Sequence, residues 1–366
     1  MNMKKLLITI MAAITLVGCG TSVKTTSSAG KQSNVIGFYN LENLFDTVHD
    51  EGKNDYQYLP DGQNQWTEAK YQKKIHNMAQ VIAAMKEDNG VWHSILGVSE
   101  IENRHVLEDL VSQPEILAAN FQIVHYDGPD RRGVDCAFLY RPSEFQLIES
   151  LTIPFTFYGV ALNSPMTPEE RKNFRTRDVL MVRGTIAGEM FAFYVAHLPS
   201  RLGGKGGDLR ARGAEIIYEH AMRLEKRFPG IKIVVMGDMN DDPFNESMAT
   251  YLHGRRTREE MSTEDFFNPY WSMLEAGYGS NAYRGVWSIF DQELVNYNLA
   301  HAPEGTLQLL PLIRKRRQVF YGRVFSKPFM TVQEGPYKGT PFRTFSGGTF
   351  IGGYSDHYPT YIIVGK

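Results

Sequence analysis

The stretch I-K-I-V-V-M at residues 231–236 constrains the fold of this chain more than any other segment. A short run that is almost wholly apolar predicts a strand buried on both faces, at the centre of a sheet. Helices or a second sheet must then cover each side of that sheet. The composition allows such layers, because hydrophobic residues make up 42% of the 366-residue chain.

The rest of the pattern predicts mixed sheets with helices outside them. Apolar residues recur at helical spacing between residues 71 and 85 and again over 208–228, and a shorter helix is expected at 103–112. Several middle strands follow one another without room for a crossover helix, so they must pair antiparallel. We therefore expect one α/β domain over residues 34–366, with two mixed sheets packed face to face. The expected strands are 34–38, 94–98, 121–125, 136–141, 146–153, 178–186, 189–197, 231–236, 293–299, 307–313, 319–325 and 359–364.

The N-terminus predicts export. Lys4 and Lys5 precede an apolar stretch at 6–17, which is too short to span a bilayer and typical of a signal peptide. The sequence L-V-G-C that ends at Cys19 resembles a bacterial lipobox, which implies cleavage before Cys19 and lipidation of its thiol. Residues 1–18 are then a lipoprotein signal peptide and 19–33 a flexible tether. Ordinary secretion with an unmodified Cys19 is the alternative. A lipidated Cys19 leaves Cys136 without a disulfide partner, so stability must come from the core.

Carboxylates and amides stand at the ends of the early strands. Asn40 and Glu42 are two residues apart, so on an extended strand they share one face. Glu100 and Glu102 follow the next strand with the same spacing. An isolated charge at the mouth of a hydrophobic strand is costly, and a hard divalent cation would offset that cost.

Later strands end in the same way. Asp238 and Asn240 follow the apolar strand 231–236, and Asp356 and His357 precede the last strand in G-G-Y-S-D-H-Y-P. Taken singly, each of these residues is more often a cap, a turn or a structural hydrogen-bonding residue than a functional one. Because so many occupy equivalent places, the set indicates one site. The set also includes His197, Asp291 and Asp135, each at a strand end.

The ordered motifs resemble the endonuclease/exonuclease/phosphatase superfamily over about residues 34–366. The resemblance implies a four-layer α/β sandwich of two mixed sheets flanked by helices. It also implies hydrolysis of a phosphate ester with one or two Mg²⁺ or Mn²⁺ ions, with Ca²⁺ as a further candidate. The motifs that carry it are F-Y-N-L-E-N-L-F-D, S-E-I-E-N-R, H-L-P-S-R, G-D-M-N-D-D-P, F-D-Q and S-D-H-Y-P.

The resemblance also implies a role for each residue. Glu100 would be the main metal ligand, and Asp238 would position or deprotonate the attacking water. His357, oriented by Asp291, would act as base or stabilise the phosphate, and His197 would contact the phosphate. The remaining residues are Asn40, Glu42 and Asp356 at the metal, Asn240 on the water or the phosphate, and Arg177 as a catalytic arginine. The pairing of Asp135 with His197 is doubtful, because the register differs by one residue.

The substrate is less constrained. A formal net charge of −2 excludes a strongly basic nucleic-acid binder, but the run R-K-R-R at 314–317 offers a local basic patch, or else a solvated strand face. We expect a monomeric nuclease acting on DNA or RNA, held by its lipid at the outer membrane or cell surface, or in the periplasm, of a bacterium. The alternatives are a lipid or inositol phosphate hydrolase and a non-catalytic surface-binding lipoprotein.

Overall fold

The computed structural model describes residues 33–158, 166–201, 206–313 and 318–366. The predicted signal peptide, Cys19 and the tether up to residue 32 lie outside the described residues, as does the basic run 314–317. None of the helices within the described ranges is long and apolar enough to span a bilayer.

The first large sheet has seven strands in the order β14-β20-β1-β2-β4-β3, with β17 also pairing with β20. Strands β1 and β2 run parallel, and their neighbours pair antiparallel. The bounds are β1 Ser33–Leu44, β2 His93–Ile101, β3 Gln122–His125, β4 Asp135–Tyr140, β14 Gln308–Leu309, β17 Gly322–Val324 and β20 Thr360–Gly365.

The second large sheet also has seven strands, in the order β5-β6-β7-β8-β13-β10-β9. Its central pair β7–β8 is parallel, while β8 and β13 are antiparallel. The bounds are β5 Phe145–Ile153, β6 Val179–Ile186, β7 Glu189–His197, β8 Lys232–Asp238, β9 Gly254–Arg255, β10 Phe266–Phe267 and β13 Asp291–Asn296.

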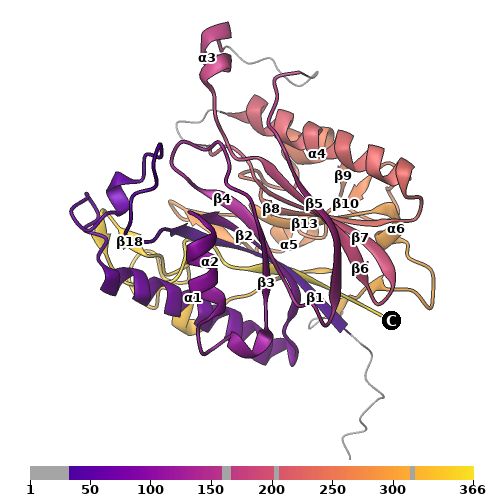
Figure 1. Cartoon of the computed structure of the whole chain (residues 1–366). Helices are drawn as coiled ribbons and strands as arrows, with labels where there is room; N and C mark the ends of the chain where they lie inside the picture. The colour runs from indigo at the N-terminus through magenta and orange to yellow at the C-terminus, as the bar shows by residue number, and fades with distance from the viewer. Residues whose placement is uncertain (1–32, 159–165, 202–205, 314–317) are drawn as a thin grey trace, which may run out of the picture. The chain divides into compact units, whose positions relative to one another are not determined.

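Helices cover the outer faces of both sheets, which confirms the four-layer sandwich. Helices α1 (Glu68–Asn89) and α2 (Arg104–Val111) lie on one side and α4 (Gly207–Arg227) on the other (Figure 1). The smaller elements lie at the margins of these layers. They are α3 Pro168–Asn173, α5 Trp271–Glu275, α6 Tyr297–Ala300, and the hairpins β11–β12 (Asn281–Tyr283, Val286–Ser288), β15–β16 (Leu312–Ile313, Val319–Phe320) and β18–β19 (Phe345–Ser346, Thr349–Phe350).

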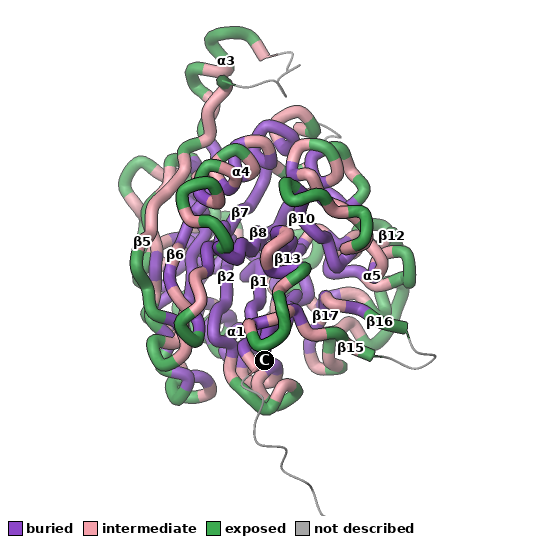
Figure 2. Tube along the Cα trace, turned by 90° about the vertical axis from the view of Figure 1, so that its right-hand side faces the viewer, coloured by how far each residue is buried: buried purple, intermediate pink, exposed green. Residues whose placement is uncertain are grey.

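Alternating side chains build the layers. Val234 and Met236 of β8 pack between the two sheets, whereas Ile233 and Val235 pack on the face that α4 covers. This is why the segment 231–236 is apolar at almost every position, and the prediction of a strand buried on both faces is confirmed. Figure 2 shows β1, β2, β7 and β8 buried at the centre.

Some predicted strand bounds were wrong in the last third. The expected strand 307–313 is two short strands, β14 and β15, with Pro311 between them. Proline has no N–H to donate to a sheet ladder, so it interrupts the pairing there. The expected strand 293–299 ends at Asn296, where α6 begins.

Candidate active site

Strand register brings the predicted residues to one edge of the two sheets. His197 is level with Asp238 on the parallel pair β7–β8, and Asp238 is level with Asp291 on β13. In the first sheet, Asn40 is level with Ser99, directly before Glu100. His357 forms a bridge with Asn281 at the same end. Residues far apart in the sequence are therefore neighbours because they end adjacent strands.

Left-handed backbone turns end these strands and overturn two predictions from strand alternation. Glu42, Glu100 and Asn240 have φ of 47°, 58° and 50°. A left-handed residue breaks the period-two alternation, and non-glycine residues of this kind cluster at functional sites. Asn40 therefore contacts different groups from Glu42. In the same way Glu102 turns away from Glu100 and accepts a hydrogen bond from the backbone of a neighbouring loop.

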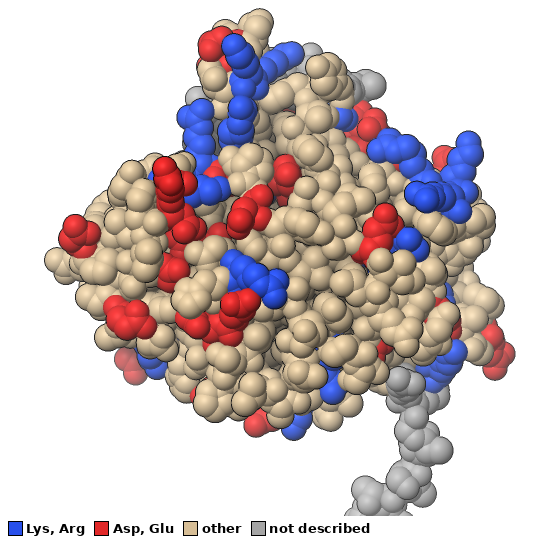
Figure 3. Space-filling model, in the orientation of Figure 1, with Lys and Arg blue, Asp and Glu red and all other residues tan. Residues whose placement is uncertain are grey.

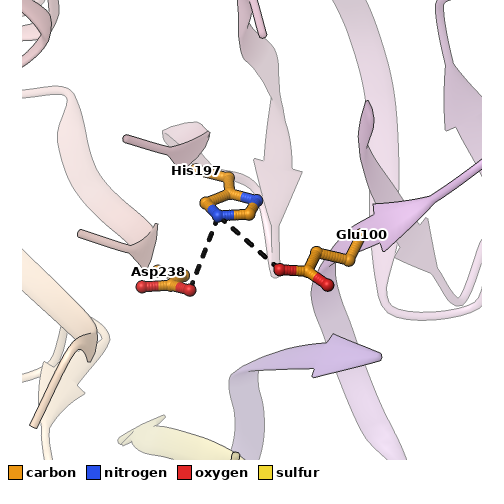
Figure 4. Close-up of side chains that lie close together, drawn as sticks. All are labelled: Glu100, His197 and Asp238. Atoms are coloured by element: carbon orange, nitrogen blue, oxygen red, sulfur yellow. Dashed lines mark ion pairs between the residues drawn. The ribbon is translucent and has the colours of Figure 1, made fainter. Parts of the chain in front are cut away.

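Glu100, His197 and Asp238 form the centre of the site (Figure 4). The Nε2 atom of His197 lies 3.8 Å from Oε1 of Glu100 and 3.6 Å from Oδ2 of Asp238. The side-chain amide of Asn40 donates to both carboxylates, at 3.3 Å and 3.0 Å. The second oxygen of Glu100 accepts the backbone N–H of Asn43 at 2.9 Å. Both acids are thus held in fixed orientations.

The protonation of this centre is set by burial. Burial raises the pKa of Asp238 to about 7, although the charge of His357 opposes the rise. Burial also lowers the pKa of His197 well below its ordinary value, and the nearby charges of Arg177 and Arg132 act in the same direction. His197 is therefore a neutral imidazole at neutral pH.

The pKa of His357 shifts in the opposite direction to that of His197. Its Nδ1 lies 2.7 Å from Oδ2 of the fully buried Asp291, and its Nε2 lies 3.8 Å from Oδ2 of Asp238. Burial opposes its charge, but the carboxylates of Asp291, Asp238 and Asp356 outweigh burial and hold the pKa of His357 well above its ordinary value. Ser355 fixes the backbone here, since its hydroxyl accepts the His357 N–H.

A second acidic group lies beside the centre. Glu42 accepts hydrogen bonds from Arg343 Nε at 3.3 Å and from the Thr344 N–H at 2.7 Å, and Lys74 Nζ lies 3.8 Å from it. Burial and the repulsion of Asp356 raise the pKa of Glu42 to about 7. Burial lowers the pKa of Lys74 to about 8. The negative charge of Glu42 is therefore offset by the positive charges of Lys74 and Arg343 beside it.

Two predicted residues lie behind or beside the site. Arg177 donates to the carbonyls of His197 and Leu198 at 3.2 Å and 3.1 Å, and it pairs with Asp130 at 3.1 Å. It supports the end of β7 from behind and is a positioning residue by this geometry. Asp135 lies 3.6 Å from Nε2 of His125, which is its partner in place of His197.

Asn240 lies next to the centre. Its N–H donates to Oδ1 of Asp238 at 2.9 Å, and its side chain donates to the carbonyl of Leu198 at 3.0 Å. Sequence reasoning missed Arg343, Lys74 and Ser355. The S-G-G-T turn at 346–349 is the one signal that points to Arg343, because it predicts a hairpin that returns the chain to the 352–357 segment.

Comparisons with known proteins agree with this architecture. The profile of the Endonuclease/Exonuclease/phosphatase family matches residues 35–366. The chain belongs to this family. A search of curated proteins found no match.

Two solved structures with a TM-score of at least 0.50 share the fold of this endonuclease/exonuclease/phosphatase protein, and a third is similar at a lower score. A crystal structure of D. rerio TDP2 complexed with single strand DNA product is 13% identical, covers 91% of this chain and 99% of its own, and has a TM-score of 0.52. A family member from Bacteroides thetaiotaomicron is 16% identical, covers 92% and 95%, and has a TM-score of 0.50. A mannosyl-6-phosphatase from the same organism is 16% identical, covers 90% and 99%, and has a TM-score of 0.49.

The site of this family member fits a divalent cation. The ligand atoms of Glu100, His197 and Asp238 all lie within 4.8 Å of one another. The Glu100 side chain is 15% exposed and that of Asp356 is 26% exposed, so both acids reach solvent at the site. Carboxylate oxygens open to water are what a hard cation such as Mg²⁺ requires. In Asn40 the amide oxygen is already engaged, by the N–H of Glu42.

Proposed function

We propose that this protein hydrolyses phosphate esters with a bound divalent cation, Mg²⁺ or Mn²⁺. The proposal rests on one observation: two groups of side chains lie on opposite sides of Asp238. On one side lie Glu100 and His197, and on the other lies the His357–Asp291 pair. Family membership supports the same reaction class.

The acids divide into two roles in this proposal. A bound cation would polarise the phosphate and lower the pKa of water. Glu100 and Asp356 would hold that cation, because both are partly exposed. Asn40 and Glu42 are also predicted as ligands, but both are buried, unlike Glu100 and Asp356. A metal titration of variants decides whether they bind the ion or orient its ligands.

Asp238 would act as the base. A general base is most effective when its pKa lies near the working pH, and the pKa of Asp238 is about 7 because of burial. Its Oδ1 accepts the Asn240 N–H, so only Oδ2 faces the centre. We propose that this oxygen takes the proton of the attacking water, which Asn240 helps to orient.

His357 would stabilise the phosphate. Its elevated pKa means that an imidazolium faces the centre through Nε2, while Nδ1 donates to Asp291. A fixed positive donor beside the phosphate stabilises the charge that develops on its non-bridging oxygens. The neutral ring of His197 would contact the phosphate from the other side.

The proposed substrate class is nucleic acid. Four exposed cations lie on the β3–β4 loop and the α3 segment, and Figure 3 shows Lys and Arg side chains gathered at the α3 end. The Arg131 side chain joins the two segments by donating to the carbonyl of Asn173 at 2.9 Å. Such a basic rim beside the acidic centre suits an extended polyanion. Its members are Arg131, Arg132, Lys172 and Arg175.

A substrate panel tests the function. Purified protein with Mg²⁺ would be assayed on plasmid DNA, RNA, bis-p-nitrophenyl phosphate, inositol phosphates and sphingomyelin. We expect EDTA-sensitive cleavage of DNA or RNA. Cleavage of lipid or inositol phosphates alone would reject the nucleic-acid substrate, and no EDTA-sensitive hydrolysis of any ester would reject the enzyme proposal.

We also propose that the protein is anchored in a bacterial membrane through lipid on Cys19 and faces the periplasm or the exterior as a monomer. The L-V-G-C sequence supports this proposal. Cys19→Ala should move the protein from the membrane fraction to the soluble fraction. Unchanged fractionation would reject the anchor.

A further inference from the structure

The β18–β19 hairpin is held rigidly beside the site. Gly347 and Gly348 form its two-residue turn with φ of 55° and 80°, as a type I′ turn requires. The rings of Phe345 and Phe350 lie 5.8 Å and 6.0 Å from the buried ring of Trp66, centroid to centroid. These aromatic contacts fix the hairpin to the core, so residues at its base have defined positions.

The base of the hairpin is tied to the acidic group. The N–H of Thr344 donates to Oε2 of Glu42 at 2.7 Å. Buried Lys74 donates to the hydroxyl of Thr344 at 2.8 Å and to the carbonyl of Tyr354. The backbone on both sides of the hairpin is therefore held, and this places the preceding residue, Arg343, at the edge of the site.

The Arg343 guanidinium lies over two acids. Its Nε donates to Oε1 of Glu42 at 3.3 Å, and its Nη2 donates to Oδ2 of Asp356 at 2.8 Å. The side chain is 51% exposed, and among the described residues Nη1 has no hydrogen-bond partner. One edge of the fork is thus anchored, and the other can reach a ligand.

Two other arginines near the site are committed to the protein's own groups. The Arg177 side chain is 8% exposed, and its donors go to Asp130 and to two backbone carbonyls. Arg201 donates to Asp241 and to groups of neighbouring loop residues. The centre itself is rich in carboxylates, so a phosphate that enters it gains from a further cation with a free donor, in addition to His357 and the proposed metal ion. Arg343 supplies both the charge and the donor.

We propose that Arg343 is a substrate-binding residue whose Nη1 donates to a non-bridging oxygen of the phosphate that the site hydrolyses. The inference rests on the proposed function and adds a residue to it. A guanidinium suits this task because its planar fork matches phosphate geometry and keeps its charge at every working pH. Asp356 and Glu42 hold the fork in place before the substrate arrives, which reduces the entropy lost on binding.

Three variants test the inference. Arg343→Gln removes the charge, Arg343→Lys keeps the charge without the fork, and Arg256→Gln is the matched control. Arg256 is also half exposed, and its Nη2 donates to one carboxylate, that of Glu275, at 2.7 Å. Each variant would be measured for kcat and KM on the substrate that the panel selects, for binding of inorganic phosphate by calorimetry, and for Tm.

We expect Arg343→Gln to raise KM and to weaken phosphate binding by about tenfold or more, with Arg343→Lys between it and the wild type. Arg256→Gln should match the wild type. Unchanged KM and phosphate affinity in Arg343→Gln would overturn the inference, as would a lowered Tm with unchanged phosphate affinity, because the guanidinium would then serve only its two acids. If the wild type hydrolyses no ester yet binds phosphate through Arg343, the proposed function fails, while the assignment of Arg343 as a phosphate-binding residue stands.

Discussion

Nδ1 of His357 and Oδ2 of Asp291 lie 2.7 Å apart, and both side chains are buried where the last strand of one sheet meets β13 of the other. The hydrogen bond orients the ring so that Nδ1–H points to Asp291 and Nε2 faces Asp238. This one contact therefore links the two sheets and also stabilises the positive charge of His357 in the site.

Replacing that acid should change both the rate and its pH dependence. Asp291→Asn removes the largest electrostatic contribution that raises the pKa of His357, so the pKa should fall. If the imidazolium is the active form, the alkaline limb of the pH–rate profile moves to lower pH. We expect kcat at neutral pH to fall by about a hundredfold or more. Steady-state kinetics from acid to alkaline pH would measure both effects.

Asp265→Asn is the control for this prediction. Asp265 is also buried and pairs with a cation, Arg255, at 2.7 Å, but it contacts no residue of the site. Its replacement should lower stability and leave the pH–rate profile in place. An Asp291→Asn enzyme with the wild-type profile would show that the pair is structural only.

Two glutamates two residues apart should behave differently toward metal. Glu100→Gln removes a carboxylate that faces the centre, so the affinity for Mn²⁺ should fall about tenfold or more. Glu102→Gln should leave metal affinity unchanged, because the Glu102 carboxyl hydrogen-bonds the Asp46 N–H outside the centre. Burial raises the pKa of Glu102 to about 9, so glutamine resembles the neutral acid it replaces.

Calorimetric titration of Mn²⁺ into the two variants would measure this difference. Equal affinities in Glu100→Gln and the wild type would remove Glu100 from the metal site. A loss in Glu102→Gln alone would place the ion in the neighbouring loop.

The difference between Glu100 and Glu102 also shows what can and cannot be predicted from the sequence. A nearly uninterrupted apolar run, as in β8, predicts which strands are central, because burial on two faces leaves few other solutions. The left-handed turns at Glu42 and Glu100 are not visible in that pattern, since glutamate has no preference for such a backbone. They decide which carboxylates meet.

The other limit on prediction from the sequence is contact between residues that lie far apart along the chain. The acids and histidines of the centre follow recognisable strands, so their convergence was predicted. Arg343 and Lys74 reach the site from a hairpin and from a helix face that carry no chemical motif. From the sequence alone, a basic side chain on either element is interpreted as a solvent-exposed charge, because its partner is not known.

His93 should control the acid stability of the fold. It is fully buried, and neither ring nitrogen has a hydrogen-bond partner among the described residues. Burial lowers its pKa to about 4. Between pH 6.5 and about 4 the unfolded chain therefore binds a proton that the folded chain does not, so stability falls as the pH falls through this window. The loss contributed by this group is about 3 kcal/mol.

His93→Leu removes this contribution. Denaturant unfolding of the variant should show a shallower loss of stability between pH 6.5 and 4 than the wild type. His105→Gln, a change at a histidine that is 64% exposed, is the control and should keep the wild-type slope. The same slope in His93→Leu would mean that other groups govern the acid limb.

Gly353 should be needed for both stability and the placement of the catalytic loop. A Cβ added at Gly353 would lie 2.1 Å from the carbonyl oxygen of Arg343 and 2.3 Å from that of Phe342. Those backbone atoms cannot give way cheaply, since Phe342 accepts the Tyr354 N–H across the base of the hairpin. Gly353→Ala should therefore lower stability by about 1–3 kcal/mol and reduce activity through displacement of the adjoining Asp356 segment.

Gly207→Ala is the matched control, because among the described residues the nearest atom to an added Cβ there is Nη2 of Arg210 at 3.9 Å. Gly207 is the first residue of α4, so alanine should leave Tm unchanged or raise it slightly. Thermal unfolding and kcat would be measured together on both variants. Wild-type Tm and kcat in Gly353→Ala would mean that the hairpin base can move apart from the catalytic loop. Arg343 would then not be held in a fixed position by the hairpin.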